Sequence, residues 1–378
     1  MNAKDRQAGF SLIEILVVIV IFSIVIVAAS QSFVPLLSQS KQQSKIAATN
    51  IEGMLGLEVL RRDIAHAGYG LYWGVDVKST PTATPTFKEV DVAADANGEA
   101  LNDAPAGNAP RAIVIGAGRG LNGSDRIAVK SVNAASNELS ERWTYLYSSP
   151  VLTVATKSPE TENIGLTDYV IVVRPDDASR FLHFTTVATG KALSSQYQNV
   201  TANYEAPDTT SIIFSLGTNS TPKMPFNRAD FYIDNLDVPQ RCAQGTGVLK
   251  KKVVDLAWNS AGFLAALPLL DCVADMQVGY RYASDGGAYA DITTYATDPD
   301  GWPFINAVEA RKIREVRVYI LAQEGQLDRS YTYPNSTIRV GDRDFNLNAT
   351  ILNWQNYRWK LYTLVIQPIC LLDTTVTP

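Results

Sequence analysis

Apolar residues are concentrated in one segment near the N-terminus. Phe10 to Ala29 reads FSLIEILVVIVIFSIVIVAA, with a single charge at Glu14. A helix of about 20 apolar residues spans a bilayer core of about 30 Å. The stretch before it carries Lys4 and Arg6 against Asp5. Because positive flanks stay in the cytoplasm, we predict one membrane-spanning helix with its N-terminus inside and the remaining chain outside.

A second helical pattern follows Pro35, and it is amphipathic. Apolar residues recur there at three- and four-residue steps, namely Ile46, Met54, Leu57, Leu60 and Ile64. Gly53 and Gly56 weaken the middle of this stretch, and Gly68 and Gly70 are typical helix stops. We therefore predict a transmembrane and assembly helix at residues 10–34 and its amphipathic continuation at residues 35–70.

Beyond residue 70 the pattern becomes that of strands. Residues 76–110 are rich in Thr, Pro, Ala, Asn, Asp and Gly, and we predict a long loop there. Short runs of branched and aromatic residues follow at 112–115, 126–129, 169–173, 211–214, 316–320 and 359–365. The predicted fold class is α+β, with the long N-terminal helix packed on a large β-rich head at residues 71–378.

Composition supports a globular head and argues against one class of partner. The 378 residues are 46% hydrophobic and 19% charged, with 33 basic and 38 acidic side chains. These values exclude a disordered chain and a multi-span membrane protein. A net charge of −5, without a tract of Lys and Arg, makes nucleic acid an unexpected partner.

Glu14 helps to decide between a signal peptide, a plain membrane anchor and a helix with a further function. An ordinary secretory signal peptide could be cleaved after Val27-Ala28-Ala29, but a carboxylate inside its apolar region would be anomalous. A plain membrane anchor is also disfavoured, because a carboxylate at helix depth costs about 3 kcal/mol. An ionisable residue at this depth indicates a function that supplies it with a partner.

The residues around Glu14 resemble a known processing signature. Gly9-Phe10-Ser11-Leu12-Ile13-Glu14 is similar to the cleavage and methylation site of type IV prepilins and of type II secretion pseudopilins. The resemblance implies that a prepilin peptidase removes residues 1–9, cutting between Gly9 and Phe10, and methylates the new amine of Phe10. It also implies that Glu14 pairs with the N-terminal ammonium of a neighbouring subunit, which would make a buried carboxylate tolerable.

The end of the amphipathic stretch resembles a smaller group of proteins within this family. Leu60 to Gly70, LRRDIAHAGYG, is similar to a segment of PilW-type minor pilins and of J-type pseudopilins. Residues 270–278 and 314–318 resemble PilW-type proteins more loosely. Arg62 and Asp63 could equally form a solvated helix end. The resemblance implies a type IV pilin-like fold in a minor pilin that primes pilus assembly and forms the tip complex, with roles in adhesion and twitching motility.

The resemblance also implies partners and a location. The partners would be the prepilin peptidase, the other minor pilins, the major pilin and a PilY-class tip adhesin. The single helix would hold the protein in the inner membrane with a periplasmic head, and assembly would bring it to the pilus or cell surface. Two alternatives stay open: a J-type pseudopilin of a type II secretion system, and a secreted binding protein or enzyme with an ordinary signal peptide.

All three cysteines follow the membrane segment, on the side where disulfides form. Cys242, Cys272 and Cys370 allow three single bridges. We favour Cys242 with Cys272, because closing a loop of about 30 residues stabilises a chain by about 3 kcal/mol. Cys370 would then be a buried thiol.

Two motifs that suggest ligand binding stand in the wrong context. Residues 118–123 satisfy GxGxxG, but another strand follows where a dinucleotide site needs a helix, so we predict a β-hairpin turn. Asp298 and Glu309 have the spacing of the first and last calcium ligands of an EF-hand. Trp302 and Pro303 occupy positions that need an oxygen ligand and a glycine, which disfavours calcium there.

We predict no catalytic residue, no cofactor and no metal site. His66 and His183 have no Ser or Cys partner that the sequence makes evident, and we interpret both as packing or surface residues. Tyr357, Trp359 and Tyr362 are interpreted as aromatic residues that pack on a sheet. The expected role is assembly and display, without catalysis.

Overall fold

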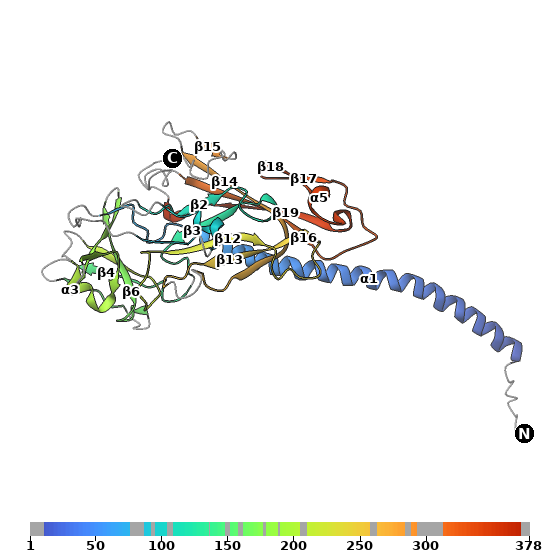
Figure 1. Ribbon diagram of the computed structural model, residues 1–378. Helices are drawn as coiled ribbons and strands as arrows, with labels where there is room; N and C mark the ends of the chain where they lie inside the picture. Colours follow the sequence, from blue (N-terminus) through green and yellow to red (C-terminus); the bar gives the residue numbers. More distant parts are fainter. Residues whose placement is uncertain are drawn as a thin grey trace, which may run out of the picture. The chain divides into compact units, whose positions relative to one another are not determined.

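The first element of the computed structural model is one long helix, α1, which spans Leu12–Ala65 and 54 residues (Figure 1). It confirms the predicted N-terminal helix and continues through Pro35. The chain divides into two compact units, Met1–Ile51 and Glu52–Pro378, and the division falls inside α1. The structure describes residues 11–75, 87–91, 95–103, 109–135, 137–147, 152–157, 162–176, 179–187, 190–204, 210–257, 263–283, 289–292 and 313–371.

The larger unit contains an eight-stranded sheet, which we call sheet B. Its strands follow the order β19-β16-β14-β13-β12-β3-β2, and β15 pairs with β14. All of these pairs are antiparallel. The strands are β2 Ile113–Gly116, β3 Arg126–Ser131, β12 Asn227–Asp234, β13 Gly247–Val253, β14 Leu267–Ala283, β15 Tyr289–Ile292, β16 Ile313–Glu324 and β19 Arg358–Ile366.

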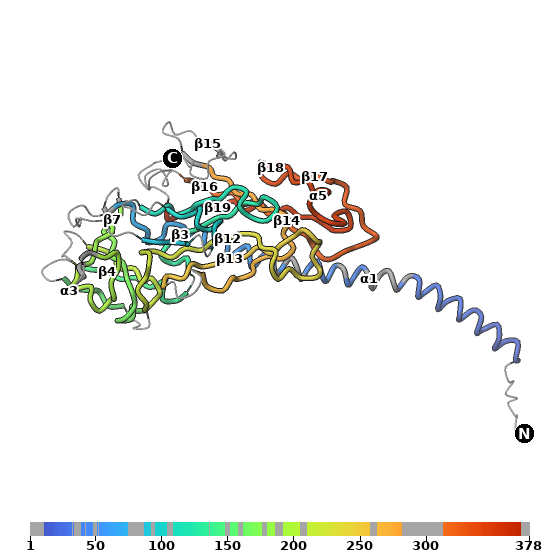
Figure 2. The backbone as a smooth tube through the Cα atoms, in the orientation of Figure 1, coloured from blue at the N-terminus to red at the C-terminus, as the bar shows by residue number. Residues whose placement is uncertain are grey.

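A second sheet of seven strands, sheet A, follows the order β1-β7-β6-β11-β4-β5, and β10 pairs with β6. The remaining strands of the described residues form two small hairpins, β8–β9 and β17–β18, of which Figure 2 labels the second. The bounds are β1 Gly74–Val75, β4 Trp143–Tyr147, β5 Thr153–Val154, β6 Tyr169–Asp176, β7 Ser179–His183, β8 Thr185–Val187, β9 Gly190–Ala192, β10 Ser195–Gln196, β11 Ser211–Ser215, β17 Thr337–Val340 and β18 Arg343–Asn346.

Among the residues that the structure describes, helical segments other than α1 are short. The α-helices are α2 Ala96–Glu99, α3 Val200–Asn203 and α5 Leu347–Thr350, and the 3-10 turns are η2 Leu121–Gly123, η4 Tyr197–Asn199, η5 Trp354–Asn356 and η6 Ile369–Leu371. Strands therefore dominate the described part of the head, as predicted. The protein has an α+β fold, with a long N-terminal helix and a large β-rich head.

The main hydrophobic core joins the end of α1 to both sheets. Leu57, Leu60 and Ile64 of α1 are buried in one cluster with residues of sheet B such as Val273 and residues of sheet A such as Ile171. The period of three and four residues puts these α1 side chains on one face, and the alternation of each strand does the same for the sheets. The last turns of α1 are therefore part of the head's core.

Residues 325–357 leave sheet B after β16 and return at β19. They contain β17, β18 and α5 (Figure 2) as well as η5. They form a second core with Ala274, Leu321 and Trp359 of sheet B. Tyr357 and Trp359 are buried in this core, and Tyr362 is half-buried against the main core. The three aromatic residues therefore pack on the sheet, as the sequence predicts.

The stretch predicted as a loop at residues 76–110 contains a short helix. Asp95 caps α2, and its side chain accepts hydrogen bonds from the N–H groups of Asn97 and Gly98 at 3.1 and 3.0 Å. Glu89 and Leu101 of this stretch are buried. The prediction of an unpatterned loop is wrong for these residues, because contacts distant in the sequence hold them against sheet B.

Candidate processing and assembly site

The start of α1 is closed by a reciprocal pair of hydrogen bonds between Ser11 and Glu14. The N–H of Ser11 donates to Oε2 of Glu14 at 2.9 Å, and the N–H of Glu14 donates to Oγ of Ser11 at 3.4 Å. This arrangement is a capping box, which satisfies two N–H groups that a helix start leaves without partners. Gly9 and Phe10 lie outside the described residues. The local sequence S-x-x-E therefore gives Glu14 a role within its own helix.

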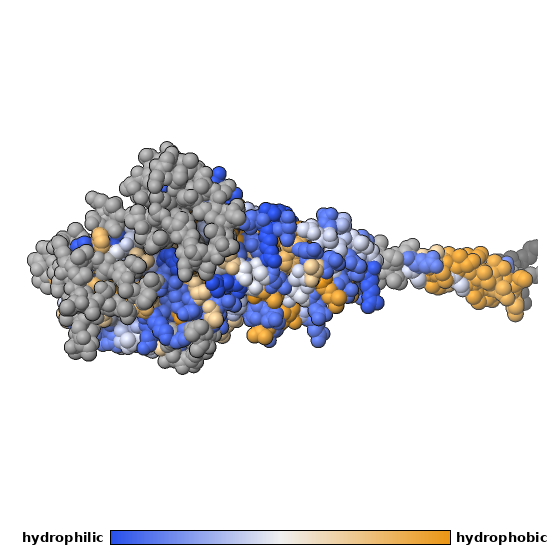
Figure 3. Space-filling model, turned by 45° about the horizontal axis from the view of Figure 1, so that its top comes forward, coloured by the Kyte–Doolittle hydropathy of each residue, from blue (hydrophilic) through white to orange (hydrophobic). Residues whose placement is uncertain are grey.

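The segment Leu12–Gln31 is long and apolar enough to cross a membrane, and none of it is buried in the protein. The apolar side chains from Leu12 to Val27 that the structure describes as exposed keep between 49% and 84% of their surface accessible (Figure 3). Ser23 is one of the few polar residues in this segment, and its Oγ donates to the carbonyl of Ile19 at 2.7 Å. Such a large apolar surface is unfavourable in water, so lipid or other apolar helices must cover it.

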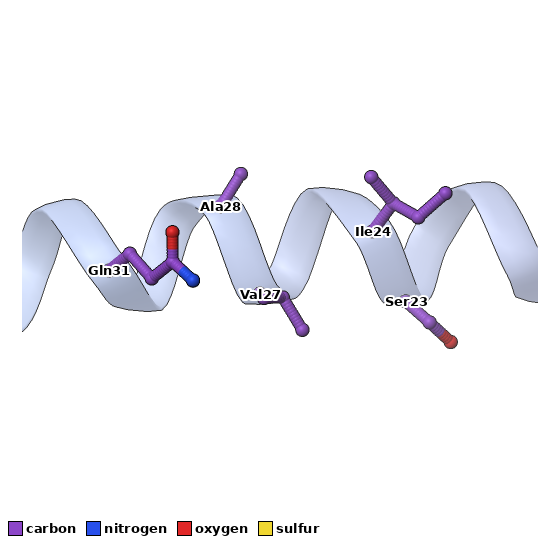
Figure 4. Close-up of a pocket in the computed structure, with 5 residues that line it drawn as sticks. All are labelled: Ser23, Ile24, Val27, Ala28 and Gln31. Carbon is purple, nitrogen blue, oxygen red and sulfur yellow. The ribbon is translucent and has the colours of Figure 1, made fainter.

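A shallow groove lies on the second half of this segment. It is lined by Ser23, Ile24, Val27, Ala28 and Gln31, all from α1. Figure 4 shows their side chains along a single helix, with no second element facing them. The groove is therefore part of the helix surface and does not enclose a ligand.

At the other end of α1, Asp63 makes a buried ion pair with the head. Its Oδ2 lies 2.5 Å from Nζ of Lys251 on β13, and both side chains are at most 6% exposed. Burial raises the pKa of Asp63, although the charge and hydrogen bond of Lys251 act to lower it. Arg62 is exposed and pairs with Glu141 at 2.5 Å. Of the two residues interpreted as a solvated helix end, Arg62 fits that interpretation and Asp63 does not.

Helix α1 and sheet B approach each other closely at Gly56. A Cβ atom at this position would lie 1.7 Å from the carbonyl oxygen of Leu269, a residue of β14. At Gly53 the nearest atom would be the end of the Leu270 side chain, at 2.9 Å. Gly56 therefore allows a contact between backbones that no larger residue permits.

The family comparison points to the same N-terminal segment. Residues 4–30 match the family model of the prokaryotic N-terminal methylation motif. The chain carries a prepilin-type methylation motif. The match supports a type IV pilin-like protein and covers Glu14 and the apolar part of α1. No curated protein and no solved structure matches the chain.

The methylation motif has consequences for processing and location. It implies processing by a prepilin peptidase and assembly with other pilins. Together with the apolar helix, it fits membrane anchoring followed by incorporation into a pilus-like assembly. The exposed apolar surface of α1 is the surface that such an assembly would cover.

Two cysteines form the disulfide that the sequence analysis favours, Cys242–Cys272. Cys370 is a free thiol and is half-buried, so the expectation of a buried thiol is only partly met. Burial raises the pKa of Cys370, and the nearby Arg180 acts to lower it. A thiol with a raised pKa is a weak nucleophile at neutral pH.

The glycine-rich motif at residues 118–123 forms the turn between β2 and β3, which pair antiparallel. This confirms the predicted hairpin. Asp125 follows the turn and is buried, and its two oxygens accept hydrogen bonds from the N–H groups of Gly118 and Val278 at 3.0 and 2.9 Å. Asp125 therefore links the hairpin to β14. The calcium-like residues Asp298 and Glu309 lie outside the described residues.

The histidines lie in separate places. His66 is half-buried, with Nδ1 2.9 Å from the carbonyl oxygen of Arg62, and His183 is buried at the end of β7. No group of three or more His, Cys, Asp or Glu residues suited to a metal ion occurs among the residues that the structure describes.

A cluster of buried charges was not predicted from the sequence. It holds the described residues between 87 and 111 against the outer face of β3 and β12. Lys130 pairs with Glu89 and Asp103 at 2.8 and 2.6 Å, and Arg228 pairs with Glu89 at 2.7 Å. The other members are Asp95, Arg111, Arg126 and Asp230. The alternation of charged residues in β3 and β12 is the only sequence signal for this cluster.

The charges in this cluster balance one another. Burial alone would raise the pKa of Asp95, but the hydrogen bond and charge of Arg126 outweigh it and lower the pKa. In the same way Lys130 and Arg111 outweigh burial and lower the pKa of Asp103. Ion pairs with good geometry and further hydrogen bonds are the condition under which buried charges are tolerated.

Proposed function

We propose that this protein is a minor pilin of a type IV pilus, which helps to prime assembly and stays in the tip complex. The observation that carries the proposal is the methylation motif joined to a head unit as large as Glu52–Pro378. Heads of that size would crowd a closely stacked fibre, whereas a subunit present in few copies avoids this. The proposed role is non-enzymatic and includes support of adhesion and twitching motility.

The proposed mechanism is the transfer of α1 from lipid to a bundle of neighbouring helices. A prepilin peptidase cuts between Gly9 and Phe10 and methylates the amine of Phe10. In the assembled state, Glu14 pairs with the N-terminal ammonium of a neighbouring subunit. Packing between helices and such a pair both favour the docked state over lipid. The head, periplasmic before assembly, then contacts other minor pilins, the major pilin and a PilY-class adhesin at the tip.

The N-terminus of the mature protein tests the processing step. Mass spectrometry of the protein isolated from its own cells should find N-methyl-Phe10 as the first residue. Gly9→Ala should leave the full-length chain in the membrane, because the peptidase requires the residue before the cut. A mature chain that begins at Ser30 or Gln31, as signal peptidase would leave it, would sink the proposal.

A deletion distinguishes the pilus from a type II secretion system, where a J-type pseudopilin would share the same motif. Loss of the protein should remove or sharply reduce surface pili and twitching, while exported enzymes still reach the medium. The protein should also be present in pili sheared from wild-type cells. Normal piliation together with loss of secretion would favour the pseudopilin.

A further inference from the structure

Strand β14 changes its partner near Cys272. Its residues 267–270 pair with β13, and its residues 273–282 pair with β16. The register of β14 shifts before Val273, against β13, and again after it, against β16. Extra residues of this kind bend a strand. β14 therefore joins the part of sheet B that contains β13 to the part that contains β16 through an irregular stretch around Cys272.

The backbone of Cys272 lies in the left-handed region, with a φ of 57°. Residues with a Cβ rarely adopt this conformation, and Asn and Asp do so more readily than others. The other non-glycine residues with positive φ in the described part of the chain are Asn122, Asp237 and Asn353, and all of them lie outside the strands. A left-handed cysteine within a strand persists only where the surrounding structure holds it.

The disulfide Cys242–Cys272 provides that restraint. It ties Cys272 to the segment between β12 and β13, 30 residues earlier in the chain. An ion pair lies beside the bond, because Arg241 and Asp271, which precede the two cysteines, approach each other to 2.7 Å. Both of these side chains are partly exposed, so their pair contributes little. The covalent bond is therefore the stronger link between the two segments.

The segment on the other side of the disulfide carries part of the second core. Ala243 is buried in that core, and its N–H donates to Oε1 of Gln323 on β16 at 2.7 Å. The carbonyl of Gln244 accepts the N–H of Leu352 at 3.0 Å. The second core is separate from the main core. Residues 325–357 can therefore lose their contacts while the rest of the head stays folded.

We propose that the Cys242–Cys272 disulfide is a redox-sensitive latch that controls the docking of residues 325–357 on sheet B. When the bond is closed, it holds Cys272 in the left-handed conformation, and the segment that follows Cys242 completes the second core. When the bond is open, Cys272 returns to an extended conformation, the irregular stretch of β14 relaxes, and residues 325–357 leave the sheet. This inference goes beyond the proposed function and does not depend on it.

Closing the latch is a thiol–disulfide exchange with an oxidised dithiol protein of the compartment in which the head folds. Cys242 is the more exposed of the two cysteines, so its thiolate attacks the disulfide of that protein and forms a mixed disulfide. Cys272 then attacks the Cys242 sulfur, and the other protein leaves as a dithiol. Two electrons and the two cysteine protons pass to that protein, and a dithiol reductant reverses the reaction.

Hydrogen exchange, followed by mass spectrometry, tests the latch in the full-length protein in detergent micelles. The chain carries Cys370→Ser, so that a dithiol reagent acts on one bond alone. Reduction should make the backbone amides of residues 325–357 exchange several-fold faster. Peptides from β3 and β12, which belong to the main core, should exchange at an unchanged rate and serve as the internal control.

A matched pair of variants tests the role of the left-handed backbone. Cys242→Ala/Cys272→Ala removes the bond and leaves a Cβ at position 272, so residues 325–357 should exchange as they do in the reduced protein. Cys242→Ala/Cys272→Gly also removes the bond, but glycine adopts positive φ without a steric penalty. The second variant should therefore recover most of the protection.

Three results would overturn the proposal. Equal exchange of residues 325–357 before and after reduction would mean that the bond does not control their docking. Faster exchange in β3 and β12 as well would mean that the bond stabilises the whole head and is not a local latch. Equal exchange in the alanine and glycine variants would mean that the conformation of residue 272 is not what the bond maintains.

Discussion

Glu14 takes part in a contact within its own chain and is also the group that we propose to pair between chains. Its Oε2 accepts the Ser11 N–H in the capping box at the start of α1. A neutral side chain with an amide oxygen can fill this role, because the capping box accepts Gln as well as Glu. Only a carboxylate can neutralise a neighbour's ammonium. The two roles can therefore be separated by substitution.

We predict that Glu14→Gln and Glu14→Ala are both processed normally and both enter pili poorly. Gln keeps the cap and loses the charge, so its defect should equal that of Ala. Ser11→Ala, which removes the other half of the cap and keeps the charge, is the matched control and should assemble nearly as the wild type does. Immunoblots of sheared pili against the membrane fraction measure the effect. Normal assembly of Glu14→Gln would contradict the charge pairing.

Inside the head, Asp63 and Lys251 also form a pair in which each charge needs the other, as we propose for Glu14 and a neighbour's ammonium. Both groups are buried, so each is tolerable only because the other is present. The pair fixes how the last turn of α1 is rotated about the helix axis and where it lies along β13. Asp63 lies in the segment of residues 60–70, which resembles PilW-type proteins. Its pairing with Lys251 explains an acidic residue at this position without a partner protein.

We predict that Asp63→Ala lowers the free energy of unfolding by about 3–5 kcal/mol, because it leaves the Lys251 ammonium buried without its partner. Replacing both residues together, as Asp63→Leu/Lys251→Met, should recover most of that loss. Arg62→Ala removes only an exposed pair and should cost less than about 1 kcal/mol. Denaturant unfolding of the three variants measures the differences. Equal losses for Arg62→Ala and Asp63→Ala would refute the argument.

At the scale of elements, the fit between α1 and sheet B depends on one glycine. In an exposed helix a glycine only weakens the structure, by about 1 kcal/mol against alanine. At Gly56 the carbonyl of Leu269 occupies the space that a side chain would need. The glycine that appears unfavourable in the helix is therefore what allows the helix to lie against β14.

We predict that Gly56→Ala lowers the free energy of unfolding by about 3 kcal/mol or more, because backbone atoms must move apart. Gly53→Ala is the matched control, since its new Cβ meets side-chain atoms alone, the flexible end of Leu270 at 2.9 Å and the Tyr362 hydroxyl at 3.8 Å. There the gain in helix propensity offsets the contact, and stability should stay within about 1 kcal/mol of the wild type. Thermal and denaturant unfolding compare the two. Similar effects at both positions would show that the contact with Leu269 does not limit stability.

The head as a whole contains two groups of carboxyls that respond to pH in opposite directions. Burial raises the pKa of Asp125 and of Asp275 to about 6; hydrogen bonds act to lower both, and Asp342 adds to the rise. Asp95 and Asp103 have lowered pKa values because of their ion pairs. The first group makes the folded state bind protons more tightly than the unfolded chain does, and the second group does the reverse.

We predict that the head is most stable at mildly acidic pH. As pH rises from about 4 to 6, the unfolded chain ionises these carboxyls while the folded state keeps Asp125 and Asp275 protonated, so stability falls, by about 3 kcal/mol for each carboxyl. As pH falls below about 4, Asp95 and Asp103 take up protons, and the stability given by their ion pairs is lost. Asp275→Asn should flatten the decline above pH 4. Denaturant unfolding between pH 3 and 8 measures this, and a wild-type optimum above pH 7 would contradict it.

The N-terminal helix and its capping motif could be predicted from the sequence alone. A run of apolar residues, a basic leader and S-x-x-E lie within a few tens of residues, and their physics is local: helix length, membrane transfer and capping all follow from neighbours in the chain. The β-hairpin at residues 118–123 and the aromatic residues of β19 were predicted for the same reason, because period two and turn glycines are local signals.

Only the tertiary structure decided which charges are buried, which glycine is indispensable and which strand ends the sheet. Asp63 meets Lys251, and Glu89 meets Lys130 and Arg228, across long separations in the sequence. From the sequence alone, a charged residue in a strand or helix is predicted to be exposed to solvent. Its burial can be seen only when the element that packs against it is known. The order of strands that leaves β19 at an edge is set by packing between distant segments, which the local pattern of side chains does not encode.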